Sequence, residues 1–267
     1  MTPPVALSVA GTDSGGAAGL AADLTTFAAL GVHGAMAVTA VTAQDTTGVH
    51  GVVPIDAAQV SAQVRAVRDD LPVAAVKTGM LGGAATVTAM AEALRGTALV
   101  VDPVLVATSG AVLGDDDVVA AYLTDLLPVA TVVTPNRHEA ARLLGLDAAE
   151  ALTGAEVDAA RALHDLGPAV VLTGGGTQES HCVDVLVDAD GTHLLRHPAV
   201  PTENDHGTGC TFSAALAALL ARGLPLAQAA RGAQGFVARA LHTSKDWRLG
   251  RGRGPVAHTH HHHTKES

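Results

Sequence analysis

Residues 5–30 read VALSVAGTDSGGAAGLAADLTTFAAL, an apolar run followed by a glycine-rich loop and an amphipathic segment. The run at residues 5–10 is typical of a buried strand, and residues 20–30 have the periodicity of a helix that stops at Gly31. This alternation returns along the chain, with apolar runs at residues 35–41, 74–77, 98–101, 131–134 and 169–173 and helical patterns at residues 57–70, 84–94, 137–144 and 156–166. Strands that are apolar throughout are covered on both faces. We therefore expect an α/β fold, a three-layer αβα sandwich around a mostly parallel sheet.

A turn signal interrupts this pattern in the last third of the chain. The tetrapeptide DADG separates short runs at residues 183–187 and 193–197, which predicts a hairpin at one edge of the sheet, followed by two closing helices. No Pro- or Ser-rich linker divides the sequence, so we expect one domain over residues 1–256. The histidine-rich residues 257–267 are predicted to form a disordered tail, the alternative being a transition-metal site.

Composition excludes several classes of protein. The 267 residues are 48% hydrophobic, enough for one large core, and the net charge of −10 with 2% aromatic residues and no basic stripe argues against nucleic acid as a partner. No apolar run is long enough for a membrane span, and the N-terminus lacks a signal-peptide pattern, so we expect a cytoplasmic protein without membrane association. In a reducing compartment Cys182 and Cys210 are expected to be thiols.

A second glycine-rich stretch, HGTGCTFSAALAALLARG at residues 206–223, opens an almost entirely apolar helix. Gly207 and Gly209 allow the backbone to turn tightly and to approach a ligand closely, and the helix N-terminus adds the positive end of its dipole. This pattern predicts an anion site at Gly207, Thr208, Gly209 and Cys210. The Cys210 thiol would lie in the same field and lose its proton more easily. The alternative is a glycine-rich turn with a small core cysteine.

Ligands of open α/β sheets bind at the carboxyl ends of the parallel strands, where several loops carry candidate residues. After the first strand, the bare loop from Gly11 to Gly19 can approach a flat ligand, and Asp23 is expected to accept hydrogen bonds from it. After the second strand, Gln44 in a predicted loop offers a donor and an acceptor to a heteroaromatic ring. Met80 follows the next apolar run and gives an adaptable wall. The alternatives are a tight turn, a solvated glutamine and a core methionine.

The next strands end in residues suited to phosphate and Mg²⁺. Asp102 offers a hard oxygen ligand, or forms a turn before Pro103. Asn136 and Glu139 are three residues apart on the first turn of a helix, either as a metal and phosphate pair or as a capping pair. The sequence TGGG at residues 173–176 is another bare loop. Because all these loops meet at one end of the sheet beside the helix mouth, together they predict phosphoryl transfer.

Six motifs follow one another along the chain: AGTDSGGAAGLAADLTTFAALGVHG, TAVTAQDTTGV, VKTGML, VVDPVLVATSG, TPNRHEA and HGTGCTFSAALAALLARG. In this order they resemble the motifs of bacterial hydroxymethylpyrimidine/phosphomethylpyrimidine kinases, of the ribokinase-like superfamily. The resemblance covers residues 5–255. It implies ATP-dependent, Mg²⁺-assisted phosphorylation of 4-amino-5-hydroxymethyl-2-methylpyrimidine and then of its monophosphate, in thiamine biosynthesis, by a homodimer.

The resemblance also implies roles for single residues. It implies a pyrimidine pocket formed by Gly11, Ala18, Asp23, Thr42, Gln44 and Met80. It implies ATP contacts at Asn136, Thr173, Gly174 and Gly207, and Mg²⁺ ligands at Asp102 and Glu139. Gly207, Thr208 and Gly209 match the anion hole, and Cys210 matches the position where many superfamily members have an aspartate base. We therefore expect the Cys210 thiolate to accept the hydroxymethyl proton.

Four positions depart from the family pattern. Thr108 and Thr173 stand where the family commonly has lysines, so two phosphate-neutralising cations are expected to be missing. Ala17 stands in place of a glycine, and Thr42 in place of a frequent valine, which adds a hydroxyl that needs a partner. Two alternatives therefore stay open: a pyridoxal or related vitamin kinase, and a degenerate kinase that acts as a pyrimidine-binding module.

Overall fold

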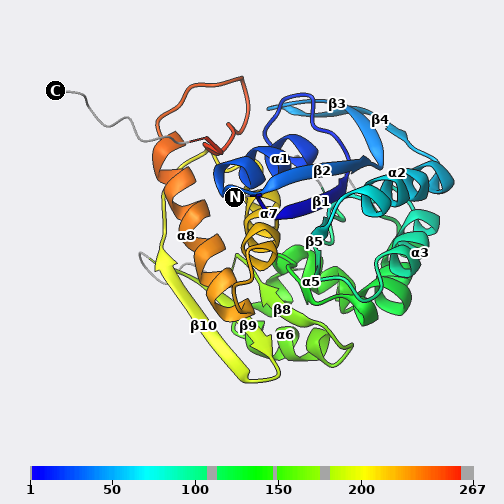
Figure 1. Cartoon of the computed structure of the whole chain (residues 1–267). Helices are drawn as coiled ribbons and strands as arrows, with labels where there is room; N and C mark the ends of the chain where they lie inside the picture. The colour runs from blue at the N-terminus through cyan, green and yellow to red at the C-terminus, as the bar shows by residue number, and fades with distance from the viewer. Residues whose placement is uncertain (1, 107–112, 147–148, 175–180, 260–267) are drawn as a thin grey trace.

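The computed structural model describes residues 2–106, 113–146, 149–174 and 181–259, and it contains a large sheet between two layers of helices (Figure 1). Within these residues the sheet has eight strands in the order β10–β9–β8–β7–β6–β5–β1–β2. The strands are β1 Val5–Ala10, β2 His33–Val38, β5 Val73–Thr78, β6 Leu99–Val101, β7 Val132–Val133, β8 Ala169–Leu172, β9 His181–Asp188 and β10 Gly191–Pro198.

Neighbouring strands from β2 to β8 pair in parallel, whereas β9 runs antiparallel to both β8 and β10. The mostly parallel sheet and the edge hairpin are therefore confirmed. The central strands β1, β6, β7 and β8 are buried along their whole length, as expected for strands with helices on both faces.

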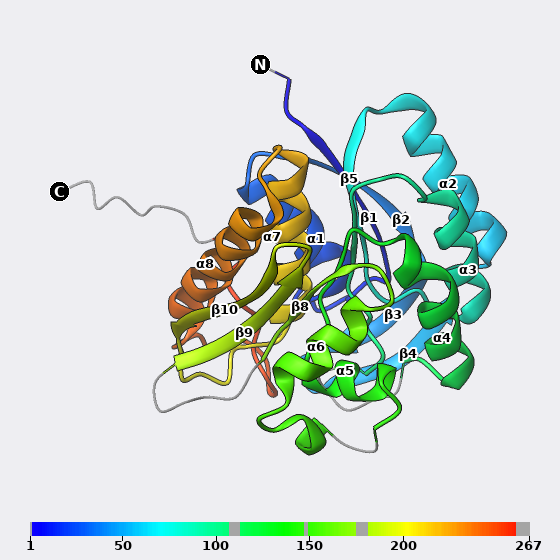
Figure 2. The same ribbon diagram turned by 90° about the horizontal axis from the view of Figure 1, so that it is seen from below.

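The helices are divided between the two faces of the sheet, as Figures 1 and 2 show. One face is covered by α2 Ala57–Asp70, α3 Ala84–Ala93, α4 Asp116–Ala121, α5 Arg137–Leu143 and α6 Glu156–His164. The other is covered by α1 Gly19–Ala29, α7 Thr208–Ala221 and α8 Leu226–Ser244. Each layer forms a separate apolar core with the sheet, and α7, with nine consecutive buried residues, lies at the centre of the second core. The expected three-layer αβα sandwich is thus confirmed.

One part of the chain differs from the sequence-based expectation. Residues 35–41 were predicted as one strand followed by a loop, but β2 ends at Val38 and two further strands, β3 Ala40–Asp45 and β4 Gly48–Pro54, form a separate antiparallel sheet. Thr39 turns the chain out of the large sheet, since its N–H donates to Ala10 and its hydroxyl donates to the Met80 carbonyl. Strand β4 contains two glycines and is mostly exposed, so it lacks the apolar alternation that marks a half-buried strand.

The C-terminal segment packs further than residue 256, where the domain was expected to end. Ala257 and His258 are buried, and the His258 Nε2 lies 3.0 Å from the Thr211 hydroxyl of α7. The packed fold therefore includes the first residues of the predicted tail, whereas residues 260–267 lie outside the described part. Among the described helices, none combines the length and the apolarity that crossing a bilayer requires.

Candidate active site

A cavity of about 850 Å³ opens at the carboxyl ends of the parallel strands. Its walls include Ala10, Gly79, Asp102, Thr134 and Thr173, which stand at or just beyond the ends of β1, β5, β6, β7 and β8. The predicted site residues that line it are Gly11, Ala18, Thr42, Gln44, Met80, Asp102, Asn136, Glu139, Thr173, Gly174, Gly207, Thr208, Gly209 and Cys210. Residues far apart in the sequence thus meet in one cavity, although their chemical roles stay predictions.

Asp23 is the predicted pocket residue that does not line this cavity. Its carboxylate is fully buried and accepts hydrogen bonds from the Ser8 hydroxyl at 2.5 Å and from the Lys77 ammonium at 2.9 Å. The prediction that Asp23 binds the ring is therefore not supported by its position. An acidic side chain one turn into α1 faces inward here because a buried lysine needs a partner.

The helix mouth has the geometry that its glycines predict. Gly207 adopts a left-handed conformation with φ +88° before α7, and a Cβ at this position would overlap the carbonyl oxygen of Ala17. This close approach brings the N-termini of α1 and α7 together at the cavity. Because the first N–H groups of a helix lack intrahelical acceptors, those of Gly209 and Cys210 are suited to bind an anion there.

The environment of Cys210 is less favourable to a thiolate than the sequence predicts. Burial raises the pKa of the Cys210 thiol to about 12, although the positive charge of Lys77 lowers it. The prediction that the helix field makes this thiol more acidic than usual is therefore wrong. A thiolate forms here as a minor species at neutral pH.

Two carboxylates, Asp102 and Glu139, also line this cavity. Asp102 accepts a hydrogen bond from Ser213 at 2.8 Å and lies 3.7 Å from the Lys77 ammonium. Burial and the charge of Asp102 hold the pKa of Glu139 well above its usual range. Asn136 caps α5, because its side chain accepts the Glu139 N–H while the Glu139 carboxylate accepts the Asn136 N–H, so the predicted capping pair is confirmed.

At the end of the cavity predicted to hold the ring, Gln44 belongs to strand β3 rather than to a loop. Its side-chain nitrogen lies 3.3 Å from the His206 Nε2. The hydroxyl of Thr42, which the frequent family valine lacks, donates to the Thr12 carbonyl at 2.7 Å. This hydroxyl therefore has its hydrogen-bond partner within the cavity wall. A Cβ at Gly11 would overlap the terminal methyl group of Met80, which therefore lies against the bare loop.

The loop after β8 is hydrogen-bonded to strand β9 of the edge hairpin. Gly174 has a left-handed φ of +71°, and its N–H donates to the Asp184 carboxylate at 3.1 Å, so this N–H is already paired within the protein. Asp184 also accepts from Gln234 at 2.9 Å. Thr108 and the glycines at 175 and 176 lie outside the described residues.

Three polar residues that line the cavity were not among the predicted site residues: Lys77, Asp13 and His206. The sequence signal for Lys77 is a lone lysine in an apolar run, VAAVKT, which makes it a candidate to compensate for the missing family lysines. Asp13 accepts the N–H groups of Gly15, Ala17 and Ala18, which organises the first glycine loop, and it lies 3.3 Å from His206. Asp13 and His206 are far apart in the sequence, and no motif predicts that they meet.

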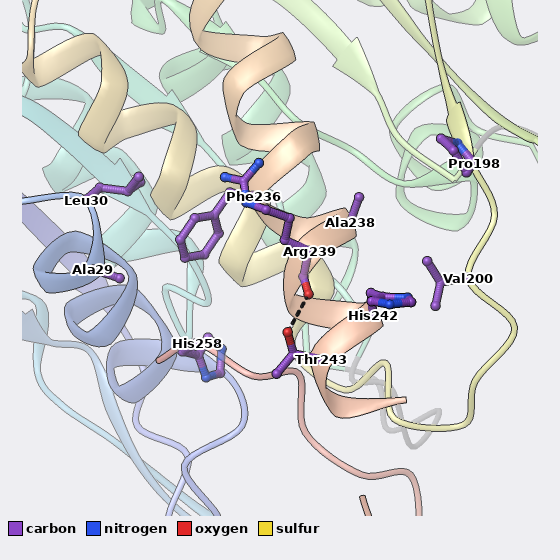
Figure 3. Close-up of a pocket in the computed structure, with 10 residues that line it drawn as sticks. All are labelled: Ala29, Leu30, Pro198, Val200, Phe236, Ala238, Arg239, His242, Thr243 and His258. Carbon is purple, nitrogen blue, oxygen red and sulfur yellow. Dashed lines mark hydrogen bonds between the residues drawn. The ribbon is translucent and has the colours of Figure 1, made fainter. Parts of the chain in front are cut away.

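A second cavity, of about 650 Å³, lies between the end of α1, α8 and the C-terminal segment. Figure 3 shows Phe236 and Arg239 of α8 on one side, Leu30 opposite and His258 below them. None of the predicted site residues lines this cavity. The larger cavity is therefore the candidate active site.

Known proteins with similar sequences and folds place this geometry in a family. The family model of phosphomethylpyrimidine kinase matches residues 13–257. The hydroxymethylpyrimidine/phosphomethylpyrimidine kinase of Rhizobium meliloti is 48% identical over 264 residues, which cover 96% of this chain and 97% of that protein.

Two solved structures have the same fold over most of the chain. The ADP complex of Bacillus subtilis pyridoxal kinase is 36% identical with a TM-score of 0.86, covering 96% of this chain and 98% of that one. The phosphomethylpyrimidine kinase from Clostridium difficile is 31% identical with a TM-score of 0.75, covering 89% of this chain and 99% of that one. The ribokinase-like fold is thereby confirmed, and the chain belongs to the phosphomethylpyrimidine kinase family.

Proposed function

We propose that this protein transfers the γ-phosphoryl group of ATP to the hydroxymethyl oxygen of 4-amino-5-hydroxymethyl-2-methylpyrimidine, and then phosphorylates the monophosphate to the diphosphate in thiamine biosynthesis. The observation that carries this proposal is the meeting of the α7 N-terminus with the Asp102 and Glu139 carboxylates in one cavity. An anion cradle that shares its cavity with an acidic pair is suited to a metal-bound triphosphate. The R. meliloti relative, which is 48% identical over 97% of its own length, supports the choice of pyrimidine.

In the first step the hydroxymethyl oxygen forms a bond to the γ-phosphorus, the bond from that phosphorus to ADP breaks, and the hydroxyl proton leaves. We assign this proton to the sulphur of Cys210, which lines the cavity at the mouth of α7. The amides of Gly209 and Cys210 stabilise the charge that develops on the transferred group. In the second step the attacking group is a phosphate oxygen that is already ionised, so no base is needed.

An assay of ADP release tests the proposed substrate. Purified protein is incubated with Mg·ATP and, in parallel, with the pyrimidine alcohol, with its monophosphate and with pyridoxal. We expect ADP from both pyrimidines. The second candidate is pyridoxal phosphorylation, favoured by the likeness to the B. subtilis pyridoxal kinase, and ADP release with pyridoxal alone would establish it instead. Binding of the pyrimidines without ADP release would identify a degenerate binding module.

We also propose that Asp102 and Glu139 hold Mg²⁺ together with phosphate oxygens. Both residues offer hard oxygen donors, and the raised pKa of Glu139 reflects burial and a like charge that a bound cation would offset. Among the described residues, no group of three or more His, Cys, Asp or Glu side chains could hold a metal. Two carboxylates suit Mg²⁺, which usually keeps water and substrate phosphates as its other ligands.

Glu139→Gln is therefore expected to weaken the binding of Mg²⁺. The variant should not unfold α5, because a glutamine side chain also completes a capping box. We expect the Mg²⁺ concentration for half-maximal activity to rise about 10- to 100-fold. Calorimetric titration of a non-hydrolysable ATP analogue, with and without Mg²⁺, provides a readout independent of turnover. An unchanged Mg²⁺ dependence of both activity and binding would contradict the assignment.

The pH dependence of the two steps should differ. Since the pKa of the Cys210 thiol is about 12 in the free protein, the thiolate fraction rises with pH throughout the neutral range. The kcat/KM for the alcohol is expected to rise about tenfold per unit between about pH 7 and 9, while that for the monophosphate, ionised above about pH 6, stays nearly flat. Rate profiles for both substrates measure this difference. A flat alcohol profile would rule out a base that acts from this pKa.

The predicted homodimer has a candidate surface. Met36 of β2, Val41 of β3 and Val52 and Val53 of β4 are exposed apolar side chains near the edge of the large sheet. We propose that a second copy covers this face, since a soluble monomer rarely exposes such a group. Sedimentation velocity should show a dimer, and Val53→Lys should shift it toward monomer. A wild-type monomer at all concentrations would contradict this proposal.

A further inference from the structure

The segment that follows α8 has no role in the proposed reaction so far, yet it contacts two parts of the candidate active site. We call residues 250–258 the C-terminal strap, and none of these described residues lines the larger cavity. On one side the strap meets the β3–β4 hairpin, and on the other it meets the residues before α7. Any effect of the strap on the reaction must therefore pass through these neighbours.

The strap is hydrogen-bonded to the turn of the hairpin. The N–H groups of Arg251 and Gly252 both donate to the Thr46 hydroxyl oxygen at 3.1 Å. A Cβ at Gly252 would overlap the Thr46 carbonyl oxygen, so this close approach of the two backbones requires a glycine. Thr46 comes directly after strand β3, two residues after Gln44. The strap thus holds the hairpin close to the residue predicted to address the ring.

The strap also pairs with the residue that precedes the anion cradle at the N-terminus of α7. The His206 N–H donates to the Gly254 carbonyl at 3.0 Å, and the Val256 N–H donates to the His206 carbonyl at 3.2 Å. Near the start of α7, the Thr211 hydroxyl lies 3.0 Å from the His258 Nε2. The strap is therefore fixed to the helix mouth at several points along its length.

These contacts close a circuit at one end of the cavity. The Gln44 side-chain nitrogen lies 3.3 Å from the His206 Nε2, and both residues line the cavity, whereas Thr46 does not. The start of the hairpin is held separately, since the Ser14 hydroxyl donates to the Gln44 carbonyl and accepts the Gln44 N–H. Releasing the strap should therefore loosen the turn of the hairpin and the Gln44 side chain while the hairpin stays attached.

We propose that the C-terminal strap positions the ring-binding end of the cavity against the anion cradle, and that Thr46 is the positioning residue through which it acts on Gln44. This inference rests on the proposed function. A hairpin that is ordered before the substrate arrives does not have to be ordered by it, so the strap contributes to the affinity for the pyrimidine. The predicted ATP contacts Asn136 and Thr173 lie at the start of α5 and after β8, so the affinity for ATP should not depend on Thr46.

The test compares Thr46→Val with Thr46→Ser. Valine keeps the shape of threonine but removes the oxygen that accepts the two strap N–H groups, whereas serine keeps that oxygen. We expect Thr46→Val to raise the KM for the pyrimidine alcohol and for its monophosphate about tenfold, as for the loss of one or two hydrogen bonds. The kcat and the KM for ATP should stay close to wild type, and Thr46→Ser should restore the pyrimidine KM. Thr47→Val is the matched control, because the Thr47 hydroxyl donates to Asp45 within the same turn.

A second variant disturbs the same contact from the strap. Gly252→Ala forces the strap away from the Thr46 carbonyl and should reproduce the effect of Thr46→Val. Because both changes break one contact, the double variant should raise the pyrimidine KM no further than the stronger single variant does.

Amide hydrogen exchange of the substrate-free protein, followed by nuclear magnetic resonance, gives a readout that does not depend on turnover. In Thr46→Val the Arg251 and Gly252 amides lose their acceptor, so they should exchange about two- to tenfold faster. Thr46→Ser and Thr47→Val should leave these exchange rates unchanged.

Faster exchange together with a raised pyrimidine KM supports the inference. A merely structural role would lower the folded fraction, which reduces the apparent kcat and leaves the KM values unchanged, and this result overturns the inference. An equal increase in the KM for ATP, or additive effects in the double variant, also overturns it. If the wild-type protein releases ADP with pyridoxal alone, the proposed function fails. The same variants are then compared by their KM for pyridoxal, where a raised value supports the inference and an unchanged value overturns it.

Discussion

Cys210→Ala is expected to lower kcat/KM for the pyrimidine alcohol by about 10²- to 10⁴-fold, the usual contribution of a positioned base. The monophosphate should lose less than about tenfold, because its attacking oxygen is already ionised. Steady-state kinetics with each substrate, at saturating Mg·ATP, measure both effects. The contrast between the two steps is the informative quantity, since a general disturbance of the helix mouth would slow both.

Cys210→Asp is the matched variant for this prediction. An aspartate places a carboxylate at the same point of α7, so the alcohol step should recover at least part of its rate at neutral pH and lose the alkaline slope. If alanine and aspartate are equally slow, or if alanine slows both steps equally, Cys210 is not the proton acceptor.

Gly207→Ala is expected to destabilise the protein by about 3 to 5 kcal/mol, because the left-handed φ and the overlap with the Ala17 carbonyl both oppose a Cβ. Gly209→Ala is the control, since a Cβ there meets nothing within 4 Å. Its free energy of unfolding should be unchanged or higher by up to about 1 kcal/mol. Urea unfolding of the two variants measures the difference.

The same pair separates folding from catalysis. Although Gly209→Ala should fold normally, its methyl group stands where the transferred phosphoryl group is expected, so kcat/KM should fall by about tenfold or more for both substrates. Full activity of Gly209→Ala would contradict the anion cradle. A stable Gly207→Ala protein would contradict the close approach of α1 and α7.

The sequence predicts the sandwich well because its central strands are apolar throughout and its loops carry strong glycine signals, as in residues 5–30. The β3–β4 hairpin escapes prediction because β4 is mostly exposed and has no periodic apolar pattern. Ligands of open α/β sheets bind at the carboxyl ends of the parallel strands, and a search of these ends finds almost every predicted site residue that lines the cavity, from Gly11 to Cys210.

What the sequence does not predict depends on burial and pairing in three dimensions. Asp23 looks like a pocket residue from its place after the glycine loop, but its partner Lys77 is 54 positions away and turns it inward. The acidity of Cys210 is misjudged for the same reason, since a motif indicates the helix field but not the desolvation that outweighs it.

The central claim is that the protein phosphorylates a pyrimidine alcohol and then the resulting monophosphate in this cavity. ³¹P nuclear magnetic resonance of protein, Mg·ATP and the alcohol, followed over time, tests this most directly. The account predicts a phosphomonoester signal that rises first and then falls as the pair of signals from the pyrimidine diphosphate appears, with two ADP formed for each diphosphate. Persistence of the ATP signals with no new phosphorus resonance, while pyridoxal under the same conditions is phosphorylated, would contradict it.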